Sequence, residues 1–248
     1  MISKTHTKYI QSLQHKKFRD EADLFIAEGP KVVLDLLAGR KFICKELFAV
    51  KIWIAEQCKL LASLNDTAVV EVEDFELKKI SALTTSHQVL AVFEKRKQNF
   101  DIRCSNKITL ALDAIQDPGN LGTIIRIADW FGIKQIIAGM DTVELYNPKV
   151  IQSSMGSFLR VNLWYQSLAE LLENPGVSVY GALLHGSNIH NETSIAEGIL
   201  VIGNESKGLS EGLLPFINHP VTIPRIGGAE SLNAAVATVI ILSHLKKG

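Results

Sequence analysis

Apolar positions in the second half of the chain form short continuous runs, separated by segments in which they recur at helical spacing. Continuously apolar strands that alternate with helices are typical of a parallel sheet covered on both faces. The pattern predicts strands at 108–114, 135–139, 160–165, 177–184, 199–203 and 220–223. It predicts helices at 121–131, 148–156, 167–173, 231–246 and, more briefly, 211–217.

The first half predicts a smaller α/β domain, with strands at 25–27, 47–50, 69–72 and 89–93. The helix after the first strand has Pro30 in its first turn and Gly39 just past its end, the usual positions of these residues. A polar segment at 94–107 separates the two halves, so we place a linker there. The predicted domains are residues 1–97 and residues 107–248, the second being a doubly wound α/β domain.

The last predicted helix is apolar around nearly its whole circumference from Leu232 to Leu245. A helix of this kind packs in a core or against another subunit.

Hydrophobic residues make up 47% of the chain and charged residues 21%, a composition typical of a folded globular protein. No apolar run reaches the roughly 18 residues that span a bilayer, and the first 20 residues lack the apolar core of a signal peptide. We therefore expect a soluble, cytoplasmic protein without a membrane partner.

The three cysteines, Cys44, Cys58 and Cys104, are far apart and have no histidine at zinc-ligand spacing. His185 and His190 are five positions apart, which does not place them on one helix face. We expect neither a disulfide framework nor a metal site.

Basic and acidic residues are equal in number, 26 each, so net charge does not indicate a nucleic-acid partner. The distribution is more informative, because all charged residues before Asp20 are basic: Lys4, Lys8, Lys16, Lys17 and Arg19. This start of the chain fits either contact with a polyanion or a solvated first helix.

Ligands of open parallel sheets bind where strands end at their carboxyl edge, so the loops after the strands are candidate sites. The loop after 108–114 runs through Asp117 and Asn120 into a helix that carries Arg126 among isoleucines. Burial of this arginine would require a bound anion or a salt bridge to Asp113 or Asp129, and the spacing alone leaves both open.

The loop after 199–203 reads Gly203-Asn204-Glu205-Ser206-Lys207-Gly208-Leu209. It is not a phosphate-binding P-loop, because Leu209 stands where the lysine belongs. It is not a nucleophile elbow around Ser206 either, because Asn204 stands where that turn needs glycine. A glycine-rich turn with one carboxylate suits close backbone approach to a flat ligand and a hydrogen bond from a ligand group to Glu205.

The loop after 220–223 begins with Ile223 and continues through Gly227 and Gly228 to Ser231, Leu232 and Asn233. Ser231 is a good N-cap for the last helix. Asn233, in the first turn of an apolar helix, carries an amide that requires hydrogen-bond partners. No strand is followed by G-x-G-x-x-G, so a nicotinamide site lacks its usual phosphate turn.

Taken together, the three loops resemble the SpoU (TrmH-like) branch of the SPOUT superfamily of RNA methyltransferases. The first family motif is met by Asn120, Gly122, Arg126, Phe131 and Gly132, the second by 203–209, and the third by 223–233. The segment Phe25-Ile-Ala-Glu28-Gly29 also resembles the start of the family's substrate-binding domain. Small departures occur at Arg225 and Ala229, where methionine and valine are common.

The resemblance implies a different fold from the one that topology rules favour. Knots are expected to be nearly absent, which would give an ordinary Rossmann-like sheet. The family instead threads its C-terminal segment through a loop into a deep trefoil knot. The resemblance therefore implies a knotted methyltransferase domain of α/β class, a smaller N-terminal substrate-binding domain, and a homodimer that uses the last helix.

The resemblance also implies a reaction, methyl transfer from S-adenosylmethionine to a ribose 2′-hydroxyl of tRNA or rRNA. The cofactor would be held by Gly203, Asn204, Ile223 and Leu232, with Leu184, at the end of its predicted strand, as a further wall. Arg126 would act on the hydroxyl, positioned with the ribose by Asn120, Glu205, Ser231 and Asn233. Two other interpretations stay open: an RNA-binding module that has lost catalysis, and a nucleotide-dependent oxidoreductase.

Overall fold

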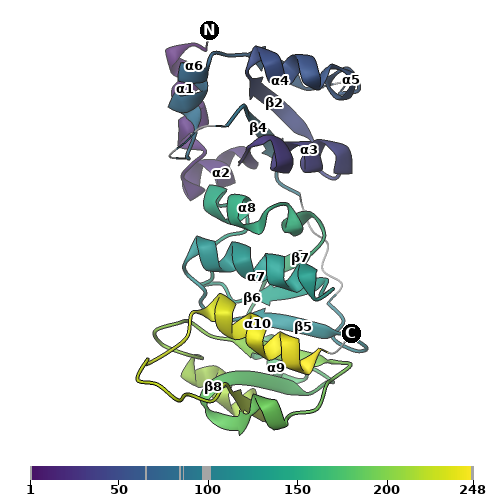
Figure 1. Ribbon diagram of the computed structural model, residues 1–248, viewed down its shortest axis with the longest axis vertical. Helices are drawn as coiled ribbons and strands as arrows, with labels where there is room; N and C mark the ends of the chain where they lie inside the picture. Colours follow the sequence, from purple (N-terminus) through teal and green to yellow (C-terminus); the bar gives the residue numbers. More distant parts are fainter. Residues whose placement is uncertain (1, 65, 84, 86, 97–101, 247–248) are drawn as a thin grey trace. The chain divides into compact units, whose positions relative to one another are not determined.

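The computed structural model describes residues 2–64, 66–83, 85, 87–96 and 102–246, and the chain forms two compact units. The first unit contains residues 1–97 and 146–159, and the second contains 98–145 and 160–248 (Figure 1). Residues 146–159 thus pack with the first unit, although the predicted domain 107–248 includes them.

The first unit is built on a mixed four-stranded sheet of order β1-β4-β2-β3. β4 pairs antiparallel with β1 and with β2, whereas β2 and β3 are parallel. All four predicted strands are present, as β1 (Leu24–Glu28), β2 (Cys44–Ala49), β3 (Ala68–Glu71) and β4 (Val89–Glu94). The helices are α1 (Lys4–Ser12), α2 (Lys16–Ala22), α3 (Pro30–Gly39), α4 (Lys51–Glu56), α5 (Cys58–Leu61), α6 (Asp74–Ile80) and α8 (Pro148–Ser154), with a 3₁₀ turn η1 (Ser157–Leu159).

An aromatic cluster holds residues 146–159 in the first unit. The ring of Phe25, on β1, lies 4.7 Å from that of Tyr146 and 6.4 Å from that of Phe158. Phe42 completes the cluster, 5.4 Å from Phe25. Because aromatic pairs at these distances add to the free energy of burial, α8 is anchored at both of its ends.

The second unit is a six-stranded sheet of order β10-β8-β9-β5-β6-β7, with every neighbouring pair parallel. This confirms the predicted doubly wound parallel sheet. The strands are β5 (Ile108–Leu112), β6 (Gln135–Ala138), β7 (Asn162–Tyr165), β8 (Val179–Asn188), β9 (Gly198–Ile202) and β10 (His219–Thr222). The helices are α7 (Pro118–Trp130), α9 (Leu168–Glu173) and α10 (Ala234–Leu245), with 3₁₀ turns η2 (Ile189–Asn191) and η3 (Glu211–Phe216).

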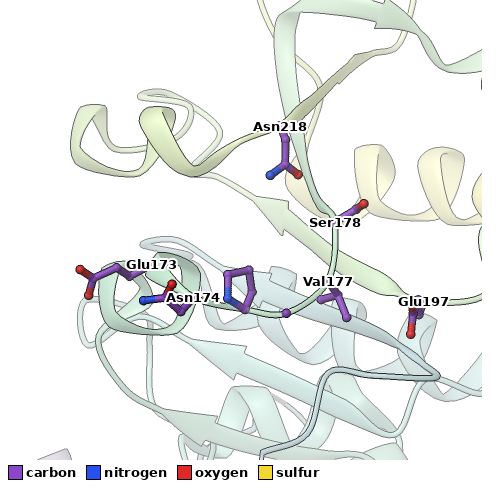
Figure 2. A pocket seen from close by; sticks show the side chains of 8 residues that line it. Glu173, Asn174, Val177, Ser178, Glu197 and Asn218 are labelled. Carbon is purple, nitrogen blue, oxygen red and sulfur yellow. The ribbon is translucent and has the colours of Figure 1, made fainter.

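A hollow opens at the amino-terminal edge of this sheet, where β8, β9 and β10 begin (Figure 2). Its lining includes Glu173, Ser178, Glu197 and Asn218. None of these residues belongs to the three loops that carry the sequence motifs. The hollow is therefore separate from the candidate site, which lies where the strands end.

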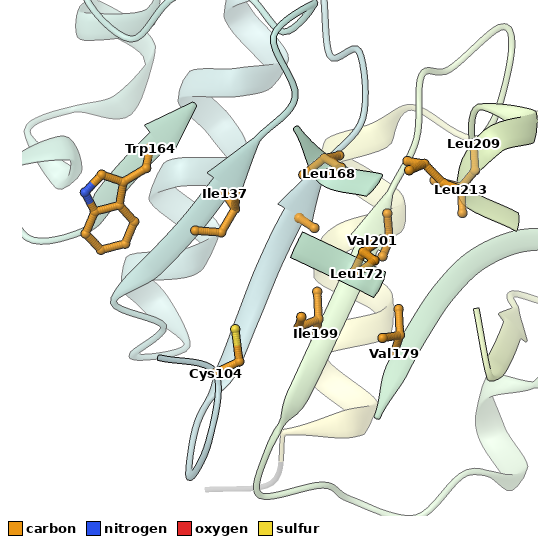
Figure 3. Close-up of a cluster of buried hydrophobic side chains, with 11 residues drawn as sticks. Cys104, Ile137, Trp164, Leu168, Leu172, Val179, Ile199, Val201, Leu209 and Leu213 are labelled. Atoms are coloured by element: carbon orange, nitrogen blue, oxygen red, sulfur yellow. The ribbon is translucent and has the colours of Figure 1, made fainter. Parts of the chain in front are cut away.

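The core of the second unit lies on both faces of the sheet. On one face, Leu168 and Leu172 of α9 pack on inward side chains of β5, β6 and β9, among them Ile137 and Val201 (Figure 3). On the other face α7 and α10 lie against each other (Figure 1). Apolar side chains buried on both faces explain why these strands read as continuous apolar runs.

The bounds of several elements differ from the predictions, and α7, for example, begins at Pro118 rather than at 121. β8 continues to Asn188 instead of ending at 184, because residues 182–186 bulge out of the pairing with β10 and the register resumes at Ser187. The last helix begins at Ala234 rather than at 231, because Asn233 caps it. Among the described residues, no helix is long and apolar enough to cross a membrane.

None of the three cysteines forms a disulfide. Within the described ranges, no group of three or more histidine, cysteine or acidic side chains could hold a metal ion.

Candidate active site

Three loops that are far apart in sequence meet at the carboxyl edge of the parallel sheet through three side chains. The side-chain amide of Asn233 donates to Oδ1 of Asn120 at 2.8 Å. The side-chain amide of Asn120 donates in turn to a carboxylate oxygen of Glu205. The chain thus forms a relay of two amides that ends on one carboxylate.

Each amide of the relay lies at the start of a helix, and hydrogen bonds determine its orientation. Asn233 is the N-cap of α10, and its Oδ1 accepts from the backbone N–H groups of Ala235 and Val236 at 3.0 and 3.3 Å. Asn120 lies in the first turn of α7, where its own backbone N–H donates to the N-cap Asp117 at 2.9 Å. Capping oxygens accept from free N–H groups at a helix start, so the donor end of Asn233 is directed away from α10. The hydrogen-bond pattern therefore determines which way both amides point.

The loop that carries Glu205 is a tight turn closed by its own backbone. Asn204 and Gly208 exchange two backbone hydrogen bonds of 3.0 and 2.9 Å, and Oδ1 of Asn204 accepts from Ser206 and Lys207. A Cβ on Gly203 would lie 2.4 Å from the backbone of Gly208, so this crossing requires glycine at position 203. Gly203, Asn204 and Gly208 thus close the turn, and Glu205 takes part in the relay.

Arg126 is exposed on α7, so it does not need the anion or carboxylate partner that its burial would require. The apolar neighbours Ile124 and Ile125 face the core, whereas the helical turn directs Arg126 to the opposite side. The two carboxylates considered as its partners are engaged elsewhere: Asp113 accepts from Ser210, and Asp129 pairs with Arg160 at 2.7 Å. Among the described residues, Arg126 has no hydrogen bond or ion pair.

The residues of the third loop are largely exposed. Ser231 is not the N-cap that the sequence suggested, because Asn233 takes that position, and it forms no hydrogen bond within the described part of the chain. Leu232 is 45% exposed and directly precedes Asn233 of the relay.

Leu184 and Ile223 are brought near each other, although Leu184 does not lie at a strand end. It lies in the bulge of β8 and is 68% exposed. Its carbonyl accepts from the hydroxyl of Thr222 at 3.2 Å, and Ile223 is the next residue along the chain. The bulge therefore directs an apolar side chain of β8 to the edge where β10 ends.

One contact of this region, between Asp113 and Ser210, was not predicted from the sequence, which considered Asp113 only as a partner of Arg126. Asp113 follows β5 and is buried, and both the backbone N–H and the hydroxyl of Ser210 donate to its carboxylate. The signal was present, since a carboxylate directly after a fully buried strand requires partners. The partner, Ser210, lies 97 residues away, and the sequence spacing of the two residues does not indicate that they are in contact.

Comparison with known proteins agrees with the motifs. The model of the SpoU rRNA Methylase family matches residues 107–243, and the model of the MRM3-like substrate binding domain matches residues 4–91. The chain is 31% identical over 246 residues to a Bacillus subtilis protein named 23S rRNA (guanosine(2553)-2′-O)-methyltransferase RlmP, which covers 95% of this chain and 94% of that protein.

Two solved structures are similar over nearly the whole chain. A putative RNA methyltransferase of the TrmH family from Porphyromonas gingivalis has a TM-score of 0.86 at 34% identity, covering 99% of this chain and 98% of that one. An AdoMet-bound rRNA methyltransferase from Sinorhizobium meliloti has a TM-score of 0.87 at 30% identity, covering 99% and 96%. The resemblance drawn from the three loops is confirmed, and this chain belongs to the SpoU rRNA methylase family.

Proposed function

We propose that this protein is an S-adenosylmethionine-dependent methyltransferase that methylates a ribose 2′-hydroxyl in RNA. The observation that carries the proposal is the relay from Asn233 through Asn120 to Glu205, which joins the three family motifs at the carboxyl edge of a parallel sheet. Ligands of open α/β sheets bind at this edge. The relatives named as 23S rRNA 2′-O-methyltransferases supply the reaction class.

S-adenosylmethionine would be held by Gly203, Asn204, Ile223 and Leu232, with Leu184 as a further wall. The side chains of Leu184 and Leu232 support this fit, because each leaves a large apolar surface exposed at the edge where the loops gather. Apolar walls with a few polar backbone groups are typical of sites for flat aromatic ligands such as adenine. When bound, the cofactor supplies the methyl group, which its sulfonium makes electrophilic.

Arg126 is the residue we propose to act on the ribose hydroxyl. A ribose hydroxyl is a poor nucleophile, so its oxygen must develop negative charge as the proton leaves. A guanidinium stays protonated at any working pH, so Arg126 would stabilise that charge as a cation rather than act as a neutral base. The hydroxyl proton would pass to solvent water or to an RNA phosphate oxygen beside Arg126. Arg126 is exposed and has no partner among the described residues, so its five N–H donors are available for ribose and phosphate oxygens.

The relay would set the geometry in which Arg126 works. Asn120 and Arg126 share α7, so fixing Asn120 against the other two loops also fixes the start of the helix that carries the arginine. Glu205 keeps acceptor capacity beyond its bond from Asn120, since a carboxylate accepts several hydrogen bonds. We assign Glu205 and Ser231 to orientation of the ribose, with Asn120 and Asn233 as positioning residues. No step requires a metal.

Ribosomal RNA is the substrate class that we favour over tRNA. The relatives that are 30% or more identical include several named 23S rRNA 2′-O-methyltransferases, one of which spans 95% of this chain. The first unit would bind that RNA, as the name of the family model for residues 4–91 suggests. The exposed lysines at its start, Lys4, Lys8, Lys16 and Lys17, would add attraction to the phosphate backbone. Arg19, the other basic residue of this segment, is buried and donates to the carbonyl of Leu13. With rRNA or tRNA as substrate, we place the activity in the cytoplasm.

We further propose a trefoil knot in the second unit and a homodimer. The support for the knot is the resemblance to the SPOUT superfamily, which threads its C-terminal segment through a loop. In this chain the C-terminal segment packs on earlier parts of the unit, because Asn233 donates to Asn120 and the carbonyl of Leu245 accepts from the N–H of Ile195. For the dimer, the support is apolar surface on the paired helices α7 and α10, where Trp130 is 86% exposed and Val236 44%. An exposed apolar surface on two adjacent helices is typical of an interface between subunits.

The decisive experiment maps 2′-O-methyl sites in cellular rRNA and tRNA with and without this protein. We expect one ribose to lose its methyl group when the protein is absent and to regain it when purified protein and S-adenosylmethionine are added to the unmodified RNA. An unchanged map, together with RNA binding in the absence of cofactor binding, would instead support the inactive RNA-binding module. Protection of the fold by NAD but not by S-adenosylmethionine would support the oxidoreductase.

A further inference from the structure

We infer that Asp113 is a positioning residue for the proposed methyl transfer, because it clamps the loop that carries Glu205 to the end of β5. The inference rests on the proposed function for its consequence in catalysis. It adds a residue outside the set that the motifs indicate. The clamp itself does not depend on the proposed function, because its hydrogen bonds all lie within the second unit.

The clamp consists of two hydrogen bonds to one buried carboxylate. Oδ2 of Asp113 accepts from the backbone N–H of Ser210 at 2.6 Å, and Oδ1 accepts from the Ser210 hydroxyl at 3.0 Å. Asp113 is 7% exposed, so water competes little for these bonds. Hydrogen bonds to a charged, buried acceptor are stronger than neutral ones. Ser210 is thus held in both position and side-chain rotamer.

A third hydrogen bond ties the other end of this loop, at Asn204, to Ala114, the residue that follows Asp113. The side-chain amide of Asn204 donates to the carbonyl of Ala114 at 2.9 Å. Ala114 has a φ of +52°, in the left-handed region that alanine rarely occupies. Strained backbone of this kind persists only where the surrounding structure requires it, which marks 113–114 as a constrained junction.

Both ends of the loop 204–210 are therefore tied to the two residues that leave β5. Glu205 lies between the ties and accepts from Asn120, which lies six residues after Ala114 on the same strand exit. The position of the carboxylate relative to α7 is therefore set by Asp113 and Ala114 at one side and by Asn120 at the other. Loss of the clamp would leave Glu205 tethered to Asn120 on a loop free to shift.

The test compares Asp113→Ala with Asp113→Asn. An asparagine can accept the Ser210 N–H through its oxygen and donate its amide to the Ser210 hydroxyl, so it preserves both contacts without the charge. We expect Asp113→Ala to lower single-turnover methylation at saturating cofactor by about 10- to 100-fold, as for small misplacement of reacting groups. Asp113→Asn should recover most of that loss, and the KM for RNA should change little in either variant.

A matched control is Thr109→Val, an isosteric change at a fully buried position on β5 that also removes hydrogen bonding, but at the other end of the strand. It should lower the melting temperature without changing turnover per folded molecule. Ser210→Ala keeps the backbone bond to Asp113 and loses only the hydroxyl bond, so it should lower turnover severalfold and remains informative if Asp113→Ala does not fold.

A direct readout that does not require activity is amide hydrogen exchange at residues 204–210, which should become faster in Asp113→Ala and stay slow in Asp113→Asn. The inference is overturned if Asp113→Ala turns over like the wild type per folded molecule, or if Asp113→Asn is as impaired as Asp113→Ala. If the wild-type protein methylates no RNA, the proposed function fails, while the exchange measurement still decides whether the clamp exists.

Discussion

The side-chain amide of Asn233 donates a 2.8 Å hydrogen bond to the side-chain oxygen of Asn120, 113 residues earlier in the chain. Asn233 caps α10 and Asn120 lies in the first turn of α7, so this one bond joins the starts of two helices. Both helices have free backbone N–H groups at these starts. Capping contacts orient the amide of Asn233, and the bonds to Asn233 and Glu205 orient that of Asn120. The bond thus aligns two helix N-termini at the candidate site.

Replacing Asn120 by aspartate should be more harmful than replacing it by alanine. An aspartate would place a second carboxylate against Glu205 and would offer no donor to it, so one of the two would have to hold a proton. Alanine only removes the relay. We expect turnover to fall by about 10²-fold for Asn120→Ala and further for Asn120→Asp, measured as single-turnover methylation with enzyme in excess over RNA. Equal activity of the two variants would contradict the close approach of this side chain to Glu205.

Arg126→Ala should lower kcat by about 10²–10⁴-fold, as for a lost group that stabilises developing charge. Because Arg126 is exposed and has no protein partner among the described residues, the melting temperature and the affinity for S-adenosylmethionine should stay near those of the wild type. Arg126→Lys should rescue little, since an ammonium lacks the planar fork of five donors.

The matched control for this prediction is Arg160→Ala, which removes the ion pair of 2.7 Å with Asp129 on the same helix. That variant should lose a little stability, on the order of 1 kcal/mol or less, and keep its turnover. Near-normal methylation by Arg126→Ala would end the catalytic assignment.

S-adenosylmethionine should raise the melting temperature of the protein, because a ligand that binds only the folded state shifts the unfolding equilibrium. A cofactor concentration of about 100 times Kd corresponds to roughly 2.7 kcal/mol of added stability. Leu232→Asp should reduce the shift by placing a charge on an apolar wall of the proposed site. No shift at saturating cofactor, measured by differential scanning fluorimetry, would refute the site.

The exposed valines of α10 should hold two copies of the chain together. We expect light scattering at micromolar concentration to give twice the chain mass of 27.3 kDa for the wild type and the single mass for Val236→Glu combined with Val239→Glu. Burial of two glutamates in an apolar interface would be strongly unfavourable. A comparably exposed residue on β3 of the first unit, Val69, serves as control, and Val69→Glu should leave the mass unchanged. A monomeric wild type would rule out the dimer.

Burial raises the pKa of Glu28 above its ordinary value of 4.5, only partly opposed by hydrogen bonds from Ser81 and Ala82. The folded first unit therefore holds this proton more tightly than the unfolded chain does. Its contribution to stability is complete below the ordinary pKa and is lost as the pH rises through the raised value.

Glu28→Gln removes this titration. The melting temperature of the variant, relative to that of the wild type, should therefore increase as the pH is raised from about 4 to about 7. Circular dichroism melts of both proteins across this range provide the measurement. A constant difference between the two would show that Glu28 does not titrate in this way.

The pattern of apolar positions was sufficient to predict the α/β class, the parallel sheet of the second unit and nearly all strands. This worked for β5 and β9 because a strand buried on both faces must be apolar at every position, a property that is local in sequence. The helical spacing of apolar residues also predicted α7, although the predicted start at 121 missed the start that Asp117 and Pro118 mark. The three loop motifs, also local, were sufficient to identify the family.

Contacts between distant residues were decided only by the tertiary structure. Asn233 rather than Ser231 caps α10, because Asn233 accepts two helix N–H groups while its amide reaches Asn120. Asp113 pairs with Ser210 rather than with Arg126, because the loop after β9 crosses the exit of β5. Spacing along a chain determines which residues share an element, but the partner of a side chain depends on how the elements pack, which no single segment encodes.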